Sequence, residues 1–169
     1  LLENNFNPQN LIIGTGLCSI KESVALTKAV SKLNVKAVLV LPAFYYKNVS
    51  QKGVIEYYRR IVEEVGDADL HYILYNIPQM SGITIDLKTI ETLVKLLPNN
   101  IVAMKESSGN RDFMLKTIKE IPSLSVFSGS DSLAVEACRN GGVGAITSTS
   151  NLSAKLLCYL LKNYEKNFS

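Results

Sequence analysis

Short apolar runs alternate with segments of helical periodicity along the whole chain, and this alternation limits the possible folds more than any other feature. Six such runs recur at intervals of roughly 25–30 residues, and each ends in glycine, proline or polar turn residues. The predicted strands are residues 11–13, 35–41, 70–75, 101–105, 124–127 and 143–147. Strict β/α alternation favours a parallel sheet with right-handed crossover connections.

A helix is predicted after each strand, and most of these helices begin at a residue that can cap the first turn. Ser19 or Ser23, Ser50 and Asp86 are the expected N-caps of the first three helices. The predicted helices are residues 19–33, 50–65, 86–97, 110–120 (or from 112), 132–140 and from about 153. Periodicity leaves two architectures open: a doubly wound open sheet, or part of an eightfold barrel, which typically needs about 250 residues.

Composition narrows the class of protein. The 169 residues suffice for one domain with its own core, and the 47% hydrophobic and 20% charged shares are those of a globular protein. A net charge of +3 without a Lys/Arg cluster argues against nucleic acid, and no apolar run approaches the ~18 residues of a membrane span. Cys18, Cys138 and Cys158 lack metal-site or disulfide spacing, as expected of reduced thiols in the cytoplasm. Because the chain opens on Leu1, we expect a fragment.

The fourth run, Ile-Val-Ala-Met-Lys-Glu-Ser-Ser-Gly over residues 101–109, brings a lysine to the end of a buried strand. Side chains alternate along a strand, so Lys105 shares a face with Ala103 and Ile101. The small Ala103 leaves room for a ligand, and poor solvation favours the neutral amine that a Schiff-base nucleophile requires. The alternative is a lysine that marks the strand end and extends to water.

A tyrosine occupies the corresponding place in the preceding strand. Residues 70–75 end at Tyr75, ahead of a turn. Two consecutive strands thus carry a proton-active side chain at the carboxyl end, the edge at which α/β sheets and barrels build their active sites. His71, the only histidine, begins its strand and is expected to be structural.

Three motifs together resemble one known family. They are Tyr75-Asn76-Ile77-Pro78 with Ser81-Gly82, Lys105-Glu106-Ser107-Ser108-Gly109-Asn110, and Ser128-Gly129-Ser130-Asp131. In these residues the chain resembles the dihydrodipicolinate synthase / N-acetylneuraminate lyase family of class I aldolases. The resemblance implies an incomplete (β/α)8 TIM barrel of about six β/α units, with residues 1–169 as a single partial domain. The units correspond to strands three to eight of the family.

The resemblance also implies roles for individual residues. Lys105 corresponds to the lysine that forms a covalent Schiff base with pyruvate or another 2-oxo acid, so no cofactor or metal is expected. Tyr75 corresponds to the proton-relay tyrosine, and Tyr46 to a tyrosine that reaches a neighbouring subunit's site. The other expected substrate-binding residues are Ile146, through its carbonyl, and Gly129, Ser130, Asp131, Ser107 and Ser148. The implied partners are a small 2-oxo acid, an aldehyde and further copies of the chain in a dimer or tetramer.

One position departs from the synthase pattern. Synthases of this family carry an arginine two residues after the proline, where it binds the carboxylate of the aldehyde substrate, and Met80 stands there. A thioether cannot form a charge-assisted pair with a carboxylate. The sequence therefore favours a lyase for a sugar acid or hydroxylated 2-oxo acid, with 4-hydroxy-tetrahydrodipicolinate synthase as the alternative. Arg111 is the candidate for a cation that replaces the missing arginine.

Two other classes of function stay open at this point. A binding or regulatory barrel can keep the scaffold without the chemistry, because fold does not determine function. An unrelated α/β ligand-binding domain would make Lys105 and Tyr75 incidental. Borohydride trapping in the presence of pyruvate separates a Schiff-base lyase from both.

Overall fold

The chain forms two compact units, a first unit of Leu1–Val102 and a second unit of Ala103–Ser169. The computed structural model describes residues 6–167, with side chains to residue 163. The division falls within strand β4 (Ile101–Glu106), so each unit contains part of that strand. The units are described separately below.

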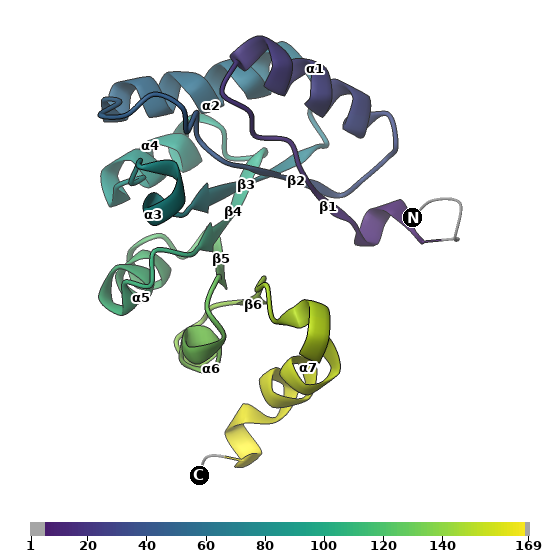
Figure 1. Cartoon of the computed structure of the whole chain (residues 1–169), viewed down its shortest axis with the longest axis vertical. Helices are drawn as coiled ribbons and strands as arrows, with labels where there is room; N and C mark the ends of the chain where they lie inside the picture. Colours follow the sequence, from purple (N-terminus) through teal and green to yellow (C-terminus); the bar gives the residue numbers. More distant parts are fainter. Residues whose placement is uncertain (1–5, 168–169) are drawn as a thin grey trace. The chain divides into compact units, whose positions relative to one another are not determined.

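The first unit contains strands β1 (Ile12–Gly14), β2 (Ala37–Val40) and β3 (His71–Asn76), with the start of β4 next to β3. Its helices are α1 (Ile20–Ser31), α2 (Gln51–Val65), α3 (Pro78–Ser81) and α4 (Leu87–Leu96), preceded by the short 3₁₀-helix η2 (Pro8–Asn10). The β1–β2 and β2–β3 pairs are parallel, as the β/α alternation predicts. Figure 1 shows α1 and α2 side by side next to these strands.

The core of the first unit lies between helix α2 and one face of strands β2 and β3. Val38 and Val40 of β2 are in register with Tyr72 and Leu74 of β3, and all four side chains are fully buried. Helix α2 contributes a buried stripe at helical spacing, which comprises Val54, Tyr57, Tyr58, Ile61 and Val62. Burial on this scale is the main stabilising term of the unit.

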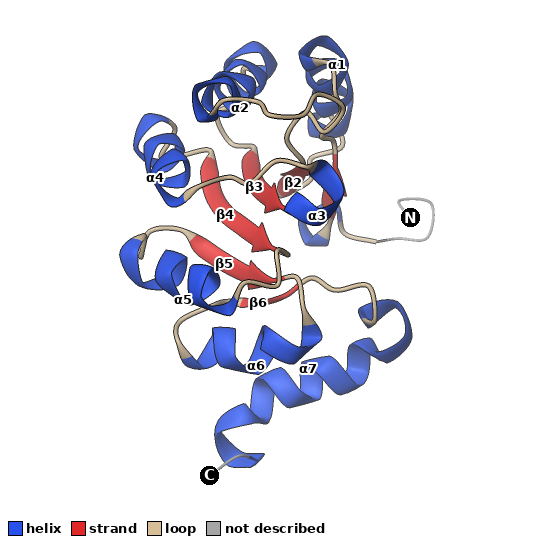
Figure 2. Ribbon diagram, turned by 60° about the vertical axis from the view of Figure 1, so that its left-hand side comes forward, coloured by secondary structure: helices blue, strands red, loops and turns tan. Residues whose placement is uncertain are grey.

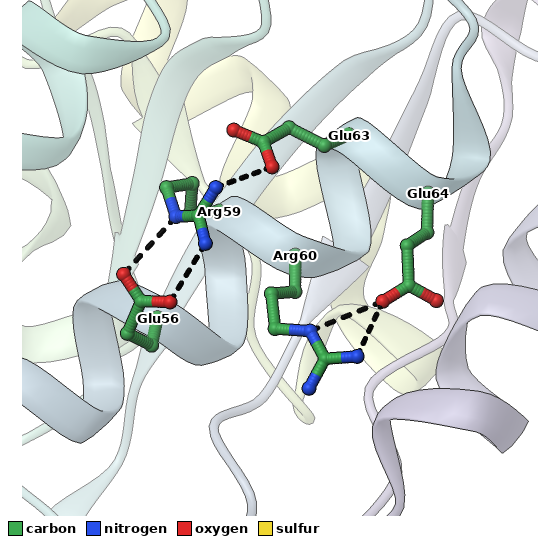
Figure 3. A network of polar contacts seen from close by, with 5 residues as sticks. All are labelled: Glu56, Arg59, Arg60, Glu63 and Glu64. Atoms are coloured by element: carbon green, nitrogen blue, oxygen red, sulfur yellow. Dashed lines mark hydrogen bonds and ion pairs between the residues drawn. The ribbon is translucent and has the colours of Figure 1, made fainter.

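The opposite face of α2 carries charges that neutralise one another. Arg59 pairs with Glu56 and Glu63, and Arg60 pairs with Glu64, all at i,i+3 or i,i+4 spacing (Figure 3). Exposed pairs of this kind add little to stability. Because they are mutually compensated, they leave no patch of one sign on this helix.

The second unit contains the remainder of β4 with β5 (Ser125–Ser128) and β6 (Gly144–Ala145), again paired in parallel. Its helices are α5 (Arg111–Glu120), α6 (Asp131–Arg139) and α7 (Ser150–Asn167), which Figure 2 shows with α6 beside α7. Val126 of β5 packs with Met114 of α5 and Ala137 of α6 in a small buried cluster. Helices α5 and α6 therefore cover the Val126 face of the strands.

Most predicted boundaries are confirmed, and the exceptions have local causes. Ser19, Ser50, Asp86 and Asn110 are all N-caps whose side chains accept a backbone N–H. Helix α3 was predicted as a turn, because four residues are too few to show a helical period, although Pro78 is favoured at a first helical position. Helix α7 begins at Ser150 and not near residue 153, where a non-helical Ser153 (φ −128°, ψ 27°) interrupts it. Among the described residues, none of the helices combines the length and apolar character needed to cross a membrane.

Candidate functional site

Lys105 lies on the face of β4 that α5 and α6 do not cover. In the second unit Met104 is in register with Val126, and Lys105 is in register with Phe127. Because Val126 faces the two helices, Met104 shares that side and the Lys105 side chain emerges from the other. Lys105 is the fifth of six residues in the strand and is half-buried beside the buried Ala103. The second unit thus places a lysine at the carboxyl end of a parallel strand, on the face that α5 and α6 do not cover.

The ends of β4 and β5 approach each other closely just beyond this lysine. The Gly129 N–H donates to the Glu106 carbonyl at 2.7 Å. A Cβ on residue 129 would lie 1.8 Å from Ser107 Oγ and 2.9 Å from the Glu106 oxygen. Only glycine fits, so two predicted site residues, Ser107 and Gly129, are brought into contact. Glu106 faces away from Lys105, is 3% exposed and accepts the Ser108 N–H at 2.6 Å, as expected of a structural contact.

Asp131, the first residue of α6, is held by two threonines of the loop that follows β6. One carboxylate oxygen accepts the Thr147 hydroxyl at 2.7 Å, and the other accepts the Thr149 hydroxyl. The hydrogen bond from Thr149 is the main cause that lowers the pKa of this carboxyl below its usual value, and the bond from Thr147 adds to it. The carboxylate therefore fixes the loop 146–149, and no sequence signal indicated this pairing.

The loop after β6 also carries two other predicted site residues. The Ile146 N–H donates to the Ser128 carbonyl at 2.9 Å, which fixes the backbone at the end of β5 and β6. Ser148 is exposed, and its carbonyl accepts Asn151 Nδ2 at 2.9 Å. Ser130 is the N-cap of α6 but makes no side-chain capping bond to a backbone N–H of the helix, and its hydroxyl pairs instead with that of Ser132 at 2.9 Å. Substrate contacts of these residues stay a prediction.

Arg111, the one arginine considered as a substitute cation, is already engaged. Its Nε lies 2.8 Å from both carboxylate oxygens of Glu136, and Nη1 contacts Asp112 at 3.1 Å. Contact with Glu136 is the main cause that raises the pKa of Arg111, and it also lowers the pKa of Glu136. The Arg111 guanidinium is therefore already paired with a carboxylate of the protein itself.

Tyr75 occupies the equivalent position in the first unit. It is the fifth of six residues of β3, and it lies on the face opposite the buried Tyr72 and Leu74. The hydroxyl of Tyr58, from α2, donates to the Val40 carbonyl at 2.8 Å, and the Tyr75 backbone lies close enough to this hydroxyl to lower its pKa as a hydrogen-bond donor. Burial raises the pKa of Tyr58 far above its usual value, so this hydroxyl keeps its proton and stays a donor.

The segment after Tyr75 is held by three polar side chains of the first unit. Asn76 is fully buried and accepts the Ile85 N–H at 3.0 Å. Ser81 bonds the Ile77 and Ile83 carbonyls at 3.1 and 3.0 Å. Lys47 donates to the Ser81 and Phe44 carbonyls at 2.9 and 2.6 Å, which ties this segment to the loop after β2.

Two predicted site residues of the first unit are exposed. Met80, on α3, is 73% exposed. Tyr46 is 66% exposed, stacks edge to face on Tyr45 with ring centroids 5.3 Å apart, and borders an apolar cavity of about 290 Å³ together with Cys18 and Tyr57. Exposure of both tyrosines is compatible with the expected contact to another subunit, which stays a prediction.

Comparisons of the chain with known proteins all point to the same family. Residues 8–168 match the Dihydrodipicolinate synthetase family. A 4-hydroxy-tetrahydrodipicolinate synthase of Listeria welshimeri is 37% identical over 168 residues, which cover 98% of this chain and 55% of the relative. An uncharacterized DapA-like lyase of Chloroflexus aurantiacus is 35% identical over 147 residues, which cover 87% of this chain and 49% of the relative.

The solved structures agree with the sequences. A dihydrodipicolinate synthase of Acinetobacter baumannii, solved in complex with pyruvate, has a TM-score of 0.84 and 31% identity over 92% of this chain and 52% of its own. The chain thus spans about half the length of the relatives it matches. With the six parallel strands, this likeness confirms the predicted fold class, an incomplete (β/α)8 barrel. The chain belongs to the Dihydrodipicolinate synthetase family.

Proposed function

We propose that this protein acts as a pyruvate-type Schiff-base aldolase, a carbon–carbon lyase that cleaves or condenses a 2-oxo acid with an aldehyde. The observation that carries the proposal is Lys105 itself. It lies at the carboxyl end of a parallel strand, half-buried beside a small alanine, on the face that α5 and α6 leave uncovered. Family membership supports the same chemistry.

The proposed reaction needs no cofactor. The neutral Lys105 amine adds to the C2 carbonyl of the 2-oxo acid, and loss of one water gives the iminium. Removal of a C3 proton gives an enamine, whose C3 forms the new bond to the aldehyde carbon while the aldehyde oxygen takes up a proton. Hydrolysis by one water then frees the amine and releases a 4-hydroxy-2-oxo acid. Cleavage is the reverse sequence.

Tyr75 is the proposed acid/base residue of these proton transfers. Its motif and its place at the end of β3 support this role. General acid–base catalysis contributes typically ~10²–10⁴-fold, so Tyr75→Phe should slow turnover on that scale. Wild-type turnover by Tyr75→Phe would rule out this role.

The proposed aldehyde is neutral and hydroxylated, as in the lyases for sugar acids or hydroxylated 2-oxo acids. Met80 offers no cation, and Arg111 already pairs with Glu136. The hydroxyls of Ser107, Ser130 and Ser148 supply hydrogen-bonding groups for such a substrate. The names of relatives such as the Listeria welshimeri protein favour the second candidate, 4-hydroxy-tetrahydrodipicolinate synthase.

The test is a condensation assay of pyruvate with aspartate semialdehyde and with a panel of neutral hydroxyaldehydes. We expect turnover of a neutral aldehyde that Lys105→Ala abolishes and Lys116→Ala, at an exposed site of α5, leaves unchanged. Efficient turnover of the semialdehyde supports the synthase. Turnover that survives Lys105→Ala contradicts the proposed role of Lys105.

A further inference from the structure

A buried tyrosine outside the predicted site contacts the backbone that carries Tyr75. Tyr58 lies on α2, is fully buried, and donates its hydroxyl proton to the Val40 carbonyl at 2.8 Å. Val40 is the last residue of β2, and its partner in the parallel register is Leu74, the residue before Tyr75. The Tyr58 hydroxyl therefore anchors the carboxyl end of β2 beside the residue of β3 that precedes Tyr75.

The Tyr75 backbone acts on the same hydroxyl as a hydrogen-bond donor that lowers its pKa, so the phenol donates to one strand and lies against the backbone N–H of the next. A neutral hydroxyl can donate and accept at once, whereas a phenylalanine ring can do neither. Within the first unit this fixes the backbone from which the Tyr75 side chain projects. Small displacements of a catalytic group are costly, because proton transfer requires hydrogen-bond geometry.

We propose that Tyr58 is a positioning residue, which acts through Tyr75 by bridging the ends of β2 and β3. The inference rests on the proposed function, since it assumes that Tyr75 transfers protons. It adds a determinant that has no contact with substrate and lies on a helix on the far side of the strands.

Two other buried tyrosines show that the Tyr58 contact is specific. Tyr57, the next residue of α2, is also buried and packs edge to face on Tyr58, but its hydroxyl bonds the Leu17 carbonyl at 2.5 Å and Ser23 at 3.0 Å. Tyr72 on β3 is fully buried, and its hydroxyl has no hydrogen-bond partner within the described residues. Of these three buried phenols, Tyr58 is thus the one that contacts the Tyr75 backbone within the described residues.

The first test measures deuterium uptake at the pyruvate methyl group in D₂O, which reports enamine formation without any aldehyde. Tyr58→Phe keeps the ring and removes only the bridging hydroxyl, so we expect an exchange rate about tenfold lower, the effect of one hydrogen bond. Tyr57→Phe removes a neighbouring hydroxyl of the same helix and should retain the wild-type rate. Equal losses in the two variants would overturn the proposal, because they would indicate general loosening of α2.

A double-mutant comparison separates positioning from structure. If Tyr58 acts through Tyr75, Tyr58→Phe should lower the exchange rate in the Tyr75 protein and have no further effect in a Tyr75→Phe background. A merely structural role predicts that Tyr58→Phe lowers the exchange rate by the same factor in the Tyr75 protein and in the Tyr75→Phe protein. That additive result would contradict the inference.

Amide hydrogen exchange gives a readout that needs no catalysis. The Tyr75 amide should exchange about tenfold faster in Tyr58→Phe than in wild type or Tyr57→Phe, while the Ile73 amide keeps its protection. Failure of the proposed function would appear as loss of pyruvate trapping at Lys105, and this amide measurement would still decide whether Tyr58 holds the Tyr75 backbone. An unchanged Tyr75 amide rate would overturn the proposal in either case.

Discussion

The two units hold the ends of their strands with different chemistry. In the first unit a buried, neutral phenol bridges backbone groups, with Tyr58 reaching from α2 to the ends of β2 and β3. In the second unit an exposed carboxylate, that of Asp131, collects the hydroxyls of Thr147 and Thr149. A buried neutral bridge is insensitive to pH and salt, whereas an exposed ionised one depends on both. The units should therefore respond differently to substitution and to acid.

The largest expected effect is at a close backbone approach in the first unit. A Cβ on residue 16 would lie 2.3 Å from the Leu41 N and 2.6 Å from the Leu41 oxygen, both main-chain atoms that cannot rotate away. Gly16→Ala should therefore lower the free energy of unfolding by about 3 kcal/mol or more. Gly14→Ala is the matched control, because its Cβ would meet only the Leu39 oxygen at 4.0 Å. Urea unfolding of both variants checks this, and equal stability of the two would contradict it.

The corresponding close contact in the second unit is at Gly129, and movement of a side chain can relieve part of it. Gly129→Ala would meet the Ser107 side chain first, so we expect a loss of about 1–3 kcal/mol of unfolding free energy. Ser107→Gly combined with Gly129→Ala removes the nearest atoms and should recover part of that loss. Urea titrations of the single and double variants measure the coupling. Strictly additive losses would show that Ser107 is not the obstacle.

Removal of buried hydroxyls sharpens the comparison within the first unit. Tyr58→Phe leaves the Val40 carbonyl without this donor and should cost about 1–2 kcal/mol of unfolding free energy. Tyr72→Phe removes a hydroxyl without a partner among the described residues and should be neutral or slightly stabilising. Chemical denaturation of the two variants measures the change in the free energy of unfolding for each. A greater loss for Tyr72→Phe than for Tyr58→Phe would reverse the assignment.

The smallest effect concerns pH in the second unit. The pKa of Asp131 is lowered in the folded chain, so its contribution is present above the unfolded value of about 3.9 and is lost as pH falls through the folded pKa. Asp131→Asn should destabilise the chain by less than about 1 kcal/mol near pH 7, and the difference should vanish in acid. Thermal unfolding across pH measures this. A difference in stability between wild type and Asp131→Asn that grows on acidification would contradict this prediction.

Alternation of side chains made the strand faces of Lys105 and Tyr75, the two residues proposed to carry the chemistry, predictable. Lys105 and Tyr75 each follow a buried neighbour on a buried strand, so the period of two fixed their faces, and the structure confirms both faces. N-caps were equally predictable, because capping depends on residues three positions apart.

Contacts between distant segments were not predictable. The Tyr58 stripe has the spacing of an ordinary core helix, and only the helix–strand packing shows that this hydroxyl reaches Val40 and Tyr75. The Asp131–Thr147 bond likewise joins residues 16 positions apart, the first residue of α6 and the loop after β6. Strand β6 was predicted to be longer than Gly144–Ala145, and Gly144, with φ +150°, departs from regular strand geometry there.

The central claim is that Lys105 is the residue that reacts with a 2-oxo acid. Incubation of the chain with pyruvate and borohydride, followed by proteolysis and mass spectrometry, identifies the lysine that carries the reduced adduct. We expect the label on the peptide containing Lys105, only when pyruvate is present, unchanged in Lys116→Ala and absent in Lys105→Ala. A label spread over exposed lysines, or one that persists at the same level in Lys105→Ala, would contradict the account.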